Sequence, residues 1–338
     1  MKWPRIHPWI VSPPLTVALC LLFTGCDTQP PLVPVIPAPE FGKIFVTANI
    51  DSAQIYVDNI NSGKLTPDTI DATAGLHQIR VEKQGFASSS QSVHVARDSI
   101  SAIYLKLVLA AGQRVALIED FSNVSCIPCV TSNLVLQRLL SGTCSRSRLV
   151  AIKYATNFPS PSDPFYLAAQ PFCDSRMAYY HILFAPTLIV DGIRRPTASD
   201  SLGIKDSVNA SLVESSRFSL LVAQSIAGNT LSIQVRLITL DTAGIDFHNL
   251  VLHTVLLEAE IMFASPPGAS GETSFHDVMR AMLPSADGEP ITRTTPGSPV
   301  LYDRQIVIAP AWNASSLQSV AFIQNKQTRI VYQAGSTY

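Results

Sequence analysis

The stretch Cys126-Ile127-Pro128-Cys129 constrains the fold more than any other feature of this chain, because it stands where a strand pattern changes into a helix pattern. An apolar run at residues 115–118 precedes it, and apolar residues recur at helical spacing over residues 130–140. Two cysteines spaced in this way can close a disulfide across a first helical turn. The unpaired N–H groups and the dipole of the helix would stabilise a thiolate at Cys126. Pro128 falls in the first turn, where a missing N–H has no cost.

The CxxC spacing by itself leaves three chemistries open. The pair can exchange electrons with other thiols, it can be a static structural disulfide, or it can contribute two ligands to a zinc site. The strand-to-helix context favours the redox pair over the static disulfide, and either of these over metal. We expect no cofactor.

Two further features accompany the motif. Asp120 stands six residues before Cys126 in the strand-like run 117–121, and Ala185-Pro186-Thr187 leads into a strand that ends at Asp191-Gly192. Together with the CxxC motif, these features resemble the thioredoxin fold over residues 114 to about 196. The resemblance implies that Cys126 is the nucleophile, Cys129 the resolving cysteine and Asp120 the buried acid that moves protons to and from Cys129.

The same resemblance implies that Pro186 follows a cis peptide bond and that the Ala185–Pro186 loop binds substrate through its backbone. The sequence also departs from the family. Ser125 stands where a tryptophan is usual, and Ile127 where a glycine is usual. Glu119 is an alternative to Asp120 as the acid, and Asp120 could instead be a solvated or capping residue.

Two other cysteines remain for the exported chain, Cys144 and Cys173. They are expected to form a stabilising disulfide or to be buried thiols, since neither has a partner at short spacing. A zinc site built from all four cysteines would need them to converge tetrahedrally, with His181 as a possible competitor, so no metal is expected. The histidines of the C-terminal third are expected to be ordinary surface or core residues; they are His248, His253 and His276.

The N-terminus has the features of an export signal. Lys2 and Arg5 precede an apolar run at residues 15–23, which is too short to cross a bilayer as a helix. The following Thr24-Gly25-Cys26 resembles the lipobox of bacterial lipoproteins, in which the cysteine is acylated and becomes the mature N-terminus. We therefore expect a signal peptide at residues 1–25 and a lipid anchor on Cys26. An ordinary cleaved signal with an incidental cysteine is the alternative.

Two segments separate the anchor from the CxxC motif. Residues 26–41 contain five prolines and are expected to be an extended tether, or simply disordered. Residues 42–108 contain short alternating strand patterns separated by turn residues. The order of Ala53-Gln54-Ile55-Tyr56-Val57-Asp58, Gly63, Thr66-Pro67, Ala74-Gly75-Leu76-His77 and Gly85-Phe86 resembles a PEGA domain, a small β-sandwich whose usual role is spacing or binding.

Alternating strand patterns return in the last third of the chain, where helical periodicity is missing. The sequence therefore predicts a multidomain α/β plus all-β protein. Its parts are a PEGA-like sandwich at residues 42–108, a thioredoxin-like α/β domain at residues 113–200 and a C-terminal β-sandwich at residues 215–338. The whole arrangement looks similar to thioredoxin-like outer-membrane lipoproteins.

Two functions follow from this organisation. The first is a thiol–disulfide oxidoreductase anchored to a bacterial membrane, either the outer membrane or the outer face of the inner membrane, with disulfide-containing envelope proteins as partners. The second is a non-enzymatic envelope protein that binds a partner or the cell wall and whose CxxC is static. With a net charge of −1 and 14% charged residues, no electrostatic field favours nucleic acid.

Overall fold

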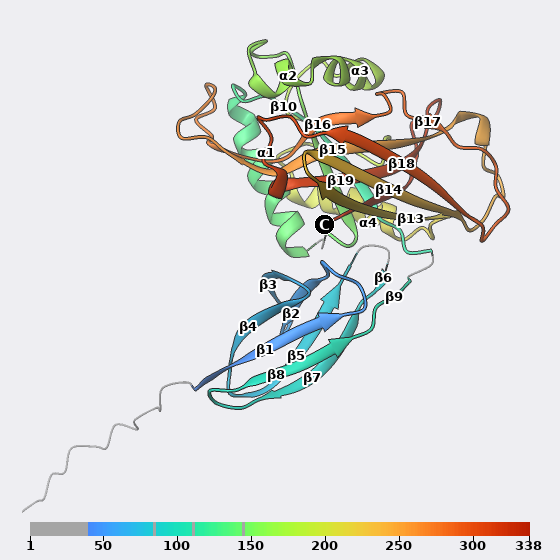
Figure 1. The fold of residues 1–338 in the computed structure, drawn as a ribbon. Helices are drawn as coiled ribbons and strands as arrows, with labels where there is room; N and C mark the ends of the chain where they lie inside the picture. Colours follow the sequence, from blue (N-terminus) through green and yellow to red (C-terminus); the bar gives the residue numbers. More distant parts are fainter. Residues whose placement is uncertain (1–39, 84–85, 110–111, 144–145) are drawn as a thin grey trace, which may run out of the picture. The chain divides into compact units, whose positions relative to one another are not determined.

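The computed structural model describes residues 40–83, 86–109, 112–143 and 146–338 (Figure 1). Strands make up 47% of the described residues and helices 17%, so the described part of the protein is mostly β. The predicted signal peptide, Cys26 and nearly all of the tether lie outside the described residues. Among the described residues, no helix has the length and apolar character needed to span a membrane.

Residues 40–109 form two small sheets and a short ribbon. The first sheet has the order β4 (Asp68–Thr73), β1 (Phe41–Ala48) and β8 (Ile100–Leu105), with β1 antiparallel to β4 and parallel to β8. The second is antiparallel, with the order β3 (Ile60–Leu65), β2 (Gln54–Val57), β5 (Gly75–Glu82) and β7 (Ser89–Val95). Strand β6 (Phe86–Ala87) pairs with β9 (Val108–Leu109).

One aliphatic core joins the two sheets into a sandwich, as the alternating pattern predicts. In β1 the side chains alternate between exposed and buried, and the buried ones pack with those of β2, β5 and β8. The strand patterns that the sequence shows in this segment all fall inside observed strands; they are residues 44–46, 54–57, 77–81, 92–95 and 103–105. Four strands were not predicted: β3, β4, β6 and β9. Strand β3 has no buried position, so no hydrophobic alternation marks it, and its pairing with β2 defines it instead.

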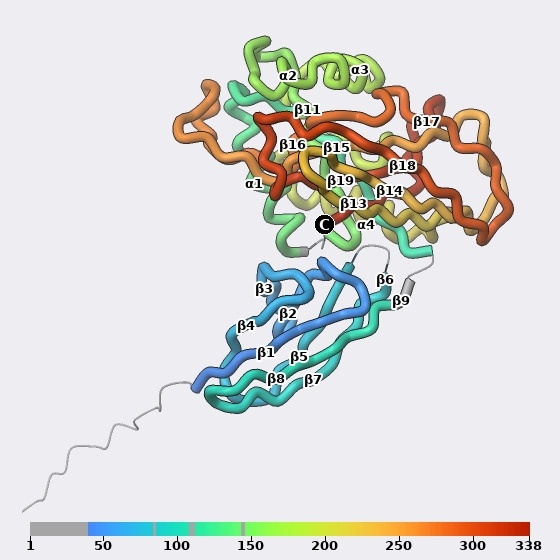
Figure 2. The backbone as a smooth tube through the Cα atoms, viewed as in Figure 1, coloured from blue at the N-terminus to red at the C-terminus, as the bar shows by residue number. Residues whose placement is uncertain are grey.

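The rest of the chain is built on one eight-stranded sheet. Its order is β12 (Thr187–Val190), β10 (Ala116–Ser122), β11 (Leu149–Ala155), β16 (Ser274–Leu283), β15 (Leu250–Met262), β19 (Leu317–Asn325) and β20 (Val331–Ser336), and β17 (Glu289–Pro290) pairs with β15. Strand β10 is parallel to β11 and antiparallel to β12. Figure 2 shows β11 and β16 side by side, joined by a parallel pairing at Lys153 and Val278.

Helices cover both faces of the sheet at β10 and β11. On one face, α1 (Ile127–Arg138), its π-helical extension at Leu139–Thr143 and α4 (Ser201–Leu212) pack on Ala116, Ile118 and Leu149. On the other face, α2 (Pro164–Ala168) and α3 (Gln170–Tyr180) pack on Leu117 and Phe121. Every residue of β10 and β11 is therefore buried. Pro171 lies in the first turn of α3, where its missing N–H has no cost.

A three-stranded sheet completes the C-terminal part. It has the order β13 (Phe218–Ala227), β14 (Thr230–Thr239) and β18 (Pro299–Val307), and its buried face shares a core with β15 and β19. The C-terminal strands thus pack sheet on sheet, but one of the two sheets also contains β10, β11 and β12. Short 3₁₀ helices lie at Phe247–Asn249 and Ala314–Ser316. The sequence did not predict α4 or β16, and the domain boundary between residues 200 and 215 stays a prediction.

Candidate functional site

Cys126 and Cys129 form a disulfide at the start of α1. The two sulfur atoms are 2.07 Å apart and the two Cα atoms 5.3 Å apart. Cys126 is the N-cap residue of α1, with an extended backbone and no side-chain capping bond, and the Cys129 amide donates to the Cys126 carbonyl at 3.1 Å. The strand-to-helix position expected for the motif is the one observed.

The exposure of the motif is uneven. Cys126 is 2% exposed and Cys129 is fully buried, whereas Ile127 between them is 68% exposed. Solvent therefore reaches the turn chiefly at Ile127 and Pro128. The sulfur pair lies just beneath this surface.

Two polar residues that the sequence did not single out hold the segment before Cys126. Asp163 accepts a hydrogen bond from the Val124 amide at 2.7 Å, and it also caps α2 through two of the helix amides. Asn123 donates to the carbonyls of Thr156 and Ser160 and accepts from the Ser125 amide. Burial raises the pKa of Asp163, and the hydrogen bonds that its carboxylate accepts from the Val124 amide and the two α2 amides oppose that rise. An acid directly before Pro164 is a capping signal that could have identified this residue.

Asp120 lies on the face of β10 that α1 covers, because it stands two residues after Ile118, which packs in the core beneath α1, and side chains two residues apart in a strand point to the same face. It is 1% exposed and pairs with the buried Lys153 of β11. Its second oxygen, Oδ1, is buried without a hydrogen-bond partner among the described residues. A second acceptor of Lys153 is Asn133 Oδ1 of α1, at 2.6 Å from Nζ.

Glu119, the alternative acid, lies on the opposite face of the strand. There it accepts hydrogen bonds from Arg176 and from the Tyr180 hydroxyl, both of α3. Burial raises the pKa of the Tyr180 hydroxyl well above its usual value. Glu119 is therefore part of the core beneath α3, and Asp120 is the acid on the side of the CxxC helix.

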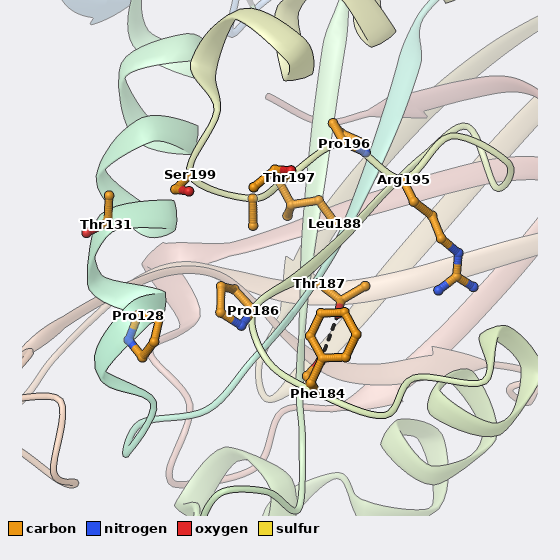
Figure 3. Close-up of a pocket in the computed structure, with 11 residues that line it drawn as sticks. Pro128, Thr131, Phe184, Pro186, Thr187, Leu188, Arg195, Pro196, Thr197 and Ser199 are labelled. Atoms are coloured by element: carbon orange, nitrogen blue, oxygen red, sulfur yellow. Dashed lines mark hydrogen bonds between the residues drawn. The ribbon is translucent and has the colours of Figure 1, made fainter.

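Pro186 borders a cavity next to the disulfide. The Ala185–Pro186 peptide bond is cis, as the sequence predicts. Pro128 and Pro186 line the same cavity of about 640 Å³ and approach it from α1 and from the loop before β12 (Figure 3). The walls are mainly apolar and include Phe184, Leu188 and Ala198; Arg195 is the one charged residue in the lining. The structure thus brings the CxxC turn and the Pro186 loop together.

Cys173 and His181 do not line this cavity. Cys173, in α3, is a buried free thiol, and burial raises its pKa to about 12. Cys144 and Cys26 lie outside the described residues, so the pairing of Cys144 with Cys173 and the lipidation of Cys26 stay predictions. His181 ends α3 in a left-handed conformation. Within the described ranges, no cluster of three or more His, Cys, Asp or Glu side chains could hold a metal ion.

Comparisons with known proteins bear on the two regions differently. Residues 41–110 match the PEGA domain, so the chain contains that domain at the place the sequence indicated. HBP35 of Porphyromonas gingivalis has a similar structure, with a TM-score of 0.57 and 11% identity over 67% of this chain and 75% of that one. At this identity the likeness concerns the fold alone.

Two weaker structural likenesses are a protein from Agrobacterium tumefaciens and a domain of the outer membrane lipoprotein Omp28 from Porphyromonas gingivalis. The first has a TM-score of 0.43 and 13% identity over 68% of this chain and 95% of that one. The second has a TM-score of 0.25 and 18% identity over 36% of this chain and 86% of that one. No curated protein gives a sequence match to this chain.

Proposed function

We propose that this protein is a thioredoxin-like, membrane-anchored thiol–disulfide oxidoreductase of the cell envelope that acts through Cys126 and Cys129. The observation that carries the proposal is the disulfide at the first turn of α1 beside a cavity bounded by Pro186. A sulfur atom at a helix N-terminus is stabilised as a thiolate by the unpaired amides and the helix dipole. The cavity beside it offers room for the substrate chain.

The exchange follows from the two sulfurs. In the reduced protein, the Cys126 thiolate attacks one sulfur of a substrate disulfide, that S–S bond breaks, and one substrate thiolate leaves with a proton from solvent. Cys129 then loses its proton and attacks the Cys126 sulfur of the mixed disulfide, which releases the second substrate thiol. The substrate disulfide has gained two electrons, and the protein is left in its disulfide form. Run in reverse, the same steps oxidise a substrate dithiol.

Asp120 is the acceptor we assign to the Cys129 proton. It is buried on the face covered by α1, and one of its oxygens has no partner among the described residues. Lys153 beside it compensates the buried carboxylate, which removes the largest cost of keeping a charge at that depth. A base held this way can take a proton without access to bulk water.

The substrate side of the site is apolar. Leu183 and Phe184, on the loop before Pro186, are 83% and 67% exposed, and Ile127 of the CxxC turn is also exposed; Phe184 lines the cavity. Exposed apolar side chains around a cavity are typical of a protein-binding surface. The substrate class we propose is an extended segment of a disulfide-containing envelope protein, with apolar side chains on either side of its cysteine.

The N-terminal sequence supports the proposed localisation in the cell envelope. The signal-like residues 1–25, the lipobox cysteine Cys26 and the proline-rich tether support a lipid-anchored protein outside the cytoplasm. That compartment is oxidising and permits a stable disulfide.

Trapping tests the enzymatic proposal. A Cys129→Ser variant of the exported chain should accumulate mixed disulfides through Cys126, and a Cys126→Ser, Cys129→Ser double variant should accumulate none. Purified wild type should also exchange with a model protein disulfide in a glutathione buffer. Absence of both trapped partners and exchange would overturn the proposal.

The burial of both sulfurs favours one second candidate, a binding protein of the envelope in which the disulfide is static. Cys126 is only 2% exposed and Cys129 is fully buried. The reduction potential separates the two functions. A pair that resists reduction below about −300 mV is structural, whereas a higher value supports exchange.

A further inference from the structure

A loop far along the sequence lies against the residues that precede Cys126. Residues 263–273 join β15 to β16, and we call them the β15–β16 loop. The Ser270 amide donates to the Val124 carbonyl at 3.2 Å, and the Ala269 amide donates to Ser125 Oγ at 3.2 Å. In Figure 1 this orange loop lies beside the start of α1. The backbone next to Cys126 thus has a second neighbour besides the Pro186 loop.

The approach of the two backbones is close enough to require a glycine. A Cβ atom placed on Gly268 would lie 2.5 Å from the Val124 carbonyl oxygen and 2.7 Å from Ser125 Oγ. Real Cβ atoms do not approach a backbone oxygen this closely, so any side chain at 268 would push the loop away from residues 124–125. The close contact between the loop and residues 124–125 therefore requires glycine at position 268.

The far end of the loop is tied to α1. Asn133 of α1 donates from Nδ2 to Glu272 Oε1 at 2.8 Å, while its Oδ1 accepts from Lys153. Lys153 in turn pairs with Asp120. A continuous set of polar contacts therefore runs from the loop, through the helix that begins at Cys126, to the buried acid. Glu272 Oε2 is buried and has no partner among the described residues, so Asn133 is the contact that holds this carboxylate in place.

We propose that the β15–β16 loop forms a wall of the redox site and that Gly268 and Glu272 determine which disulfides can reach Cys126. The inference rests on the proposed function for its biological meaning. The hydrogen bonds described above that hold the wall against residues 124–125 and α1 are two from backbone amides and one between an amide and a carboxylate, while Phe263 at the start of the loop packs on Phe165. Small disulfides approach Cys126 past the closed wall, and bulky ones require it to open.

Site-resolved alkylation tests the wall in the full-length reduced protein. Gly268→Ala displaces the loop by steric contact, and Glu272→Ala releases it without altering the backbone. Loss of one such tie is worth about 1.4 kcal/mol, so the rate of Cys126 modification by a bulky maleimide should rise about ten-fold in each variant. Modification by the smaller iodoacetamide should rise less. Rates equal to wild type for both variants and both reagents would overturn the inference.

Two matched controls separate the wall from general effects. Gly142→Ala adds a methyl group where no atom lies within 4 Å, and Glu260→Ala removes an exposed carboxylate at the end of β15. Both should keep the wild-type alkylation rates. If Gly268→Ala fails to fold, Glu272→Ala alone decides the outcome, because its backbone is unchanged.

Turnover distinguishes a failure of the wall from a failure of the proposed function. If wild type exchanges with neither cystine nor a folded protein disulfide, the oxidoreductase proposal fails, and alkylation still decides whether the loop limits access. If wild type turns over, the exchange rates of the two loop variants should increase more with the protein disulfide than with cystine. Equal increases in rate for both substrates would contradict the assigned role in specificity.

Discussion

The PEGA domain and the region that contains the disulfide use their strands in different ways. In β1 of the PEGA domain, buried and exposed side chains alternate, and all the buried ones enter a single aliphatic core. In β10, all seven residues are buried, because helices cover both faces of the sheet. One covered face is enough for a small binding or spacing module. Two covered faces give a place where charged side chains can be held away from water.

Ion pairs follow the same division. In the PEGA domain, Lys43 pairs with Asp71 at the surface, where both side chains are more than half exposed. In the other region, Arg176 pairs with Glu119 at 2% and 0% exposure, and Lys153 pairs with Asp120. An exposed pair adds little to stability, whereas a buried pair is costly to break. The second region therefore supplies the fully buried charges that such chemistry needs.

The largest expected effect is a loss of disulfide exchange, which should depend on the disulfide region and not on the PEGA domain. Cys126→Ser should reduce disulfide exchange to the background rate, because Cys126 is the N-cap sulfur of α1 and the remaining sulfur of the motif, Cys129, is fully buried. Deleting the PEGA domain should leave the rate of exchange with a small disulfide unchanged. Stopped-flow exchange with a chromogenic disulfide measures both. A PEGA deletion that lost exchange while remaining folded would break the functional division.

Breaking one buried ion pair should produce the largest loss of stability. Arg176→Met leaves Glu119 buried without its cation, which should cost about 3–5 kcal/mol in urea unfolding. The double variant Arg176→Met, Glu119→Leu should recover most of that loss, since no uncompensated charge remains.

Lys43→Met in the PEGA domain is the matched control, and it should leave the unfolding midpoint unchanged. A loss at Lys43 comparable to that at Arg176 would contradict the division between surface and buried pairs.

Substituting one tightly packed glycine in each region should show how closely the backbone is packed there. A Cβ at Gly192 would lie 1.8 Å from the Arg329 carbonyl oxygen, and the residue has a φ of +77°. Overpacking and left-handed strain together should cost about 3–4 kcal/mol in Gly192→Ala. Gly42 in β1 would meet the Ala96 carbonyl oxygen at 2.4 Å without a positive φ, so Gly42→Ala should cost less, about 2 kcal/mol.

Hydrogen exchange, followed on peptides from each region, measures the two losses of stability separately. A larger loss for Gly42→Ala than for Gly192→Ala would mean that the sandwich around β1 cannot relax and the turn after β12 can.

The smallest expected effects are two pH dependences of opposite sign. Burial lowers the pKa of His253 well below 6.5, so the unfolded chain binds a proton that the folded chain cannot accept. The folded state therefore keeps its full stability above pH 6.5 and loses free energy of unfolding as the pH falls below that value. In the PEGA domain, the hydrogen bond to Asp58 raises the pKa of His77. That contribution is complete below pH 6.5 and is lost as the pH rises through the folded-state pKa.

Urea midpoints at pH 5.5 and 7.5 test both signs. His253→Phe keeps a ring stacked on Phe322 and should remove part of the loss on acidification. His77→Gln should remove the small gain of the PEGA domain at low pH. Unchanged pH dependence in His253→Phe would mean that the folded state already admits the proton.

Much of the fold could be predicted because its signals are local. Every strand pattern of the PEGA domain fell inside an observed strand, and the CxxC turn was found where an apolar strand passes into a helix. Local signals failed where a strand has no hydrophobic alternation, as in β3 of the β2–β3 hairpin, or where pairing with distant residues defines it, as in β16 beside β11. Strand β3 has no buried position, and β16 reads in sequence only as a mixed polar segment around His276.

The sequence determined the parts of the site that depend on near neighbours, which are the two cysteines at the first helical turn and the proline between them. The cis bond before Pro186 was implied by the family resemblance and not by a local pattern, and the disulfide was one of three chemistries that the spacing left open. Only the tertiary structure decided that Asp120, and not Glu119, faces the CxxC helix, and that Asn133 and Glu272 join the network. The physical reason is that neighbouring residues of a strand point to opposite faces, so the choice depends on which helix covers each face. The sequence contains no local record of that choice.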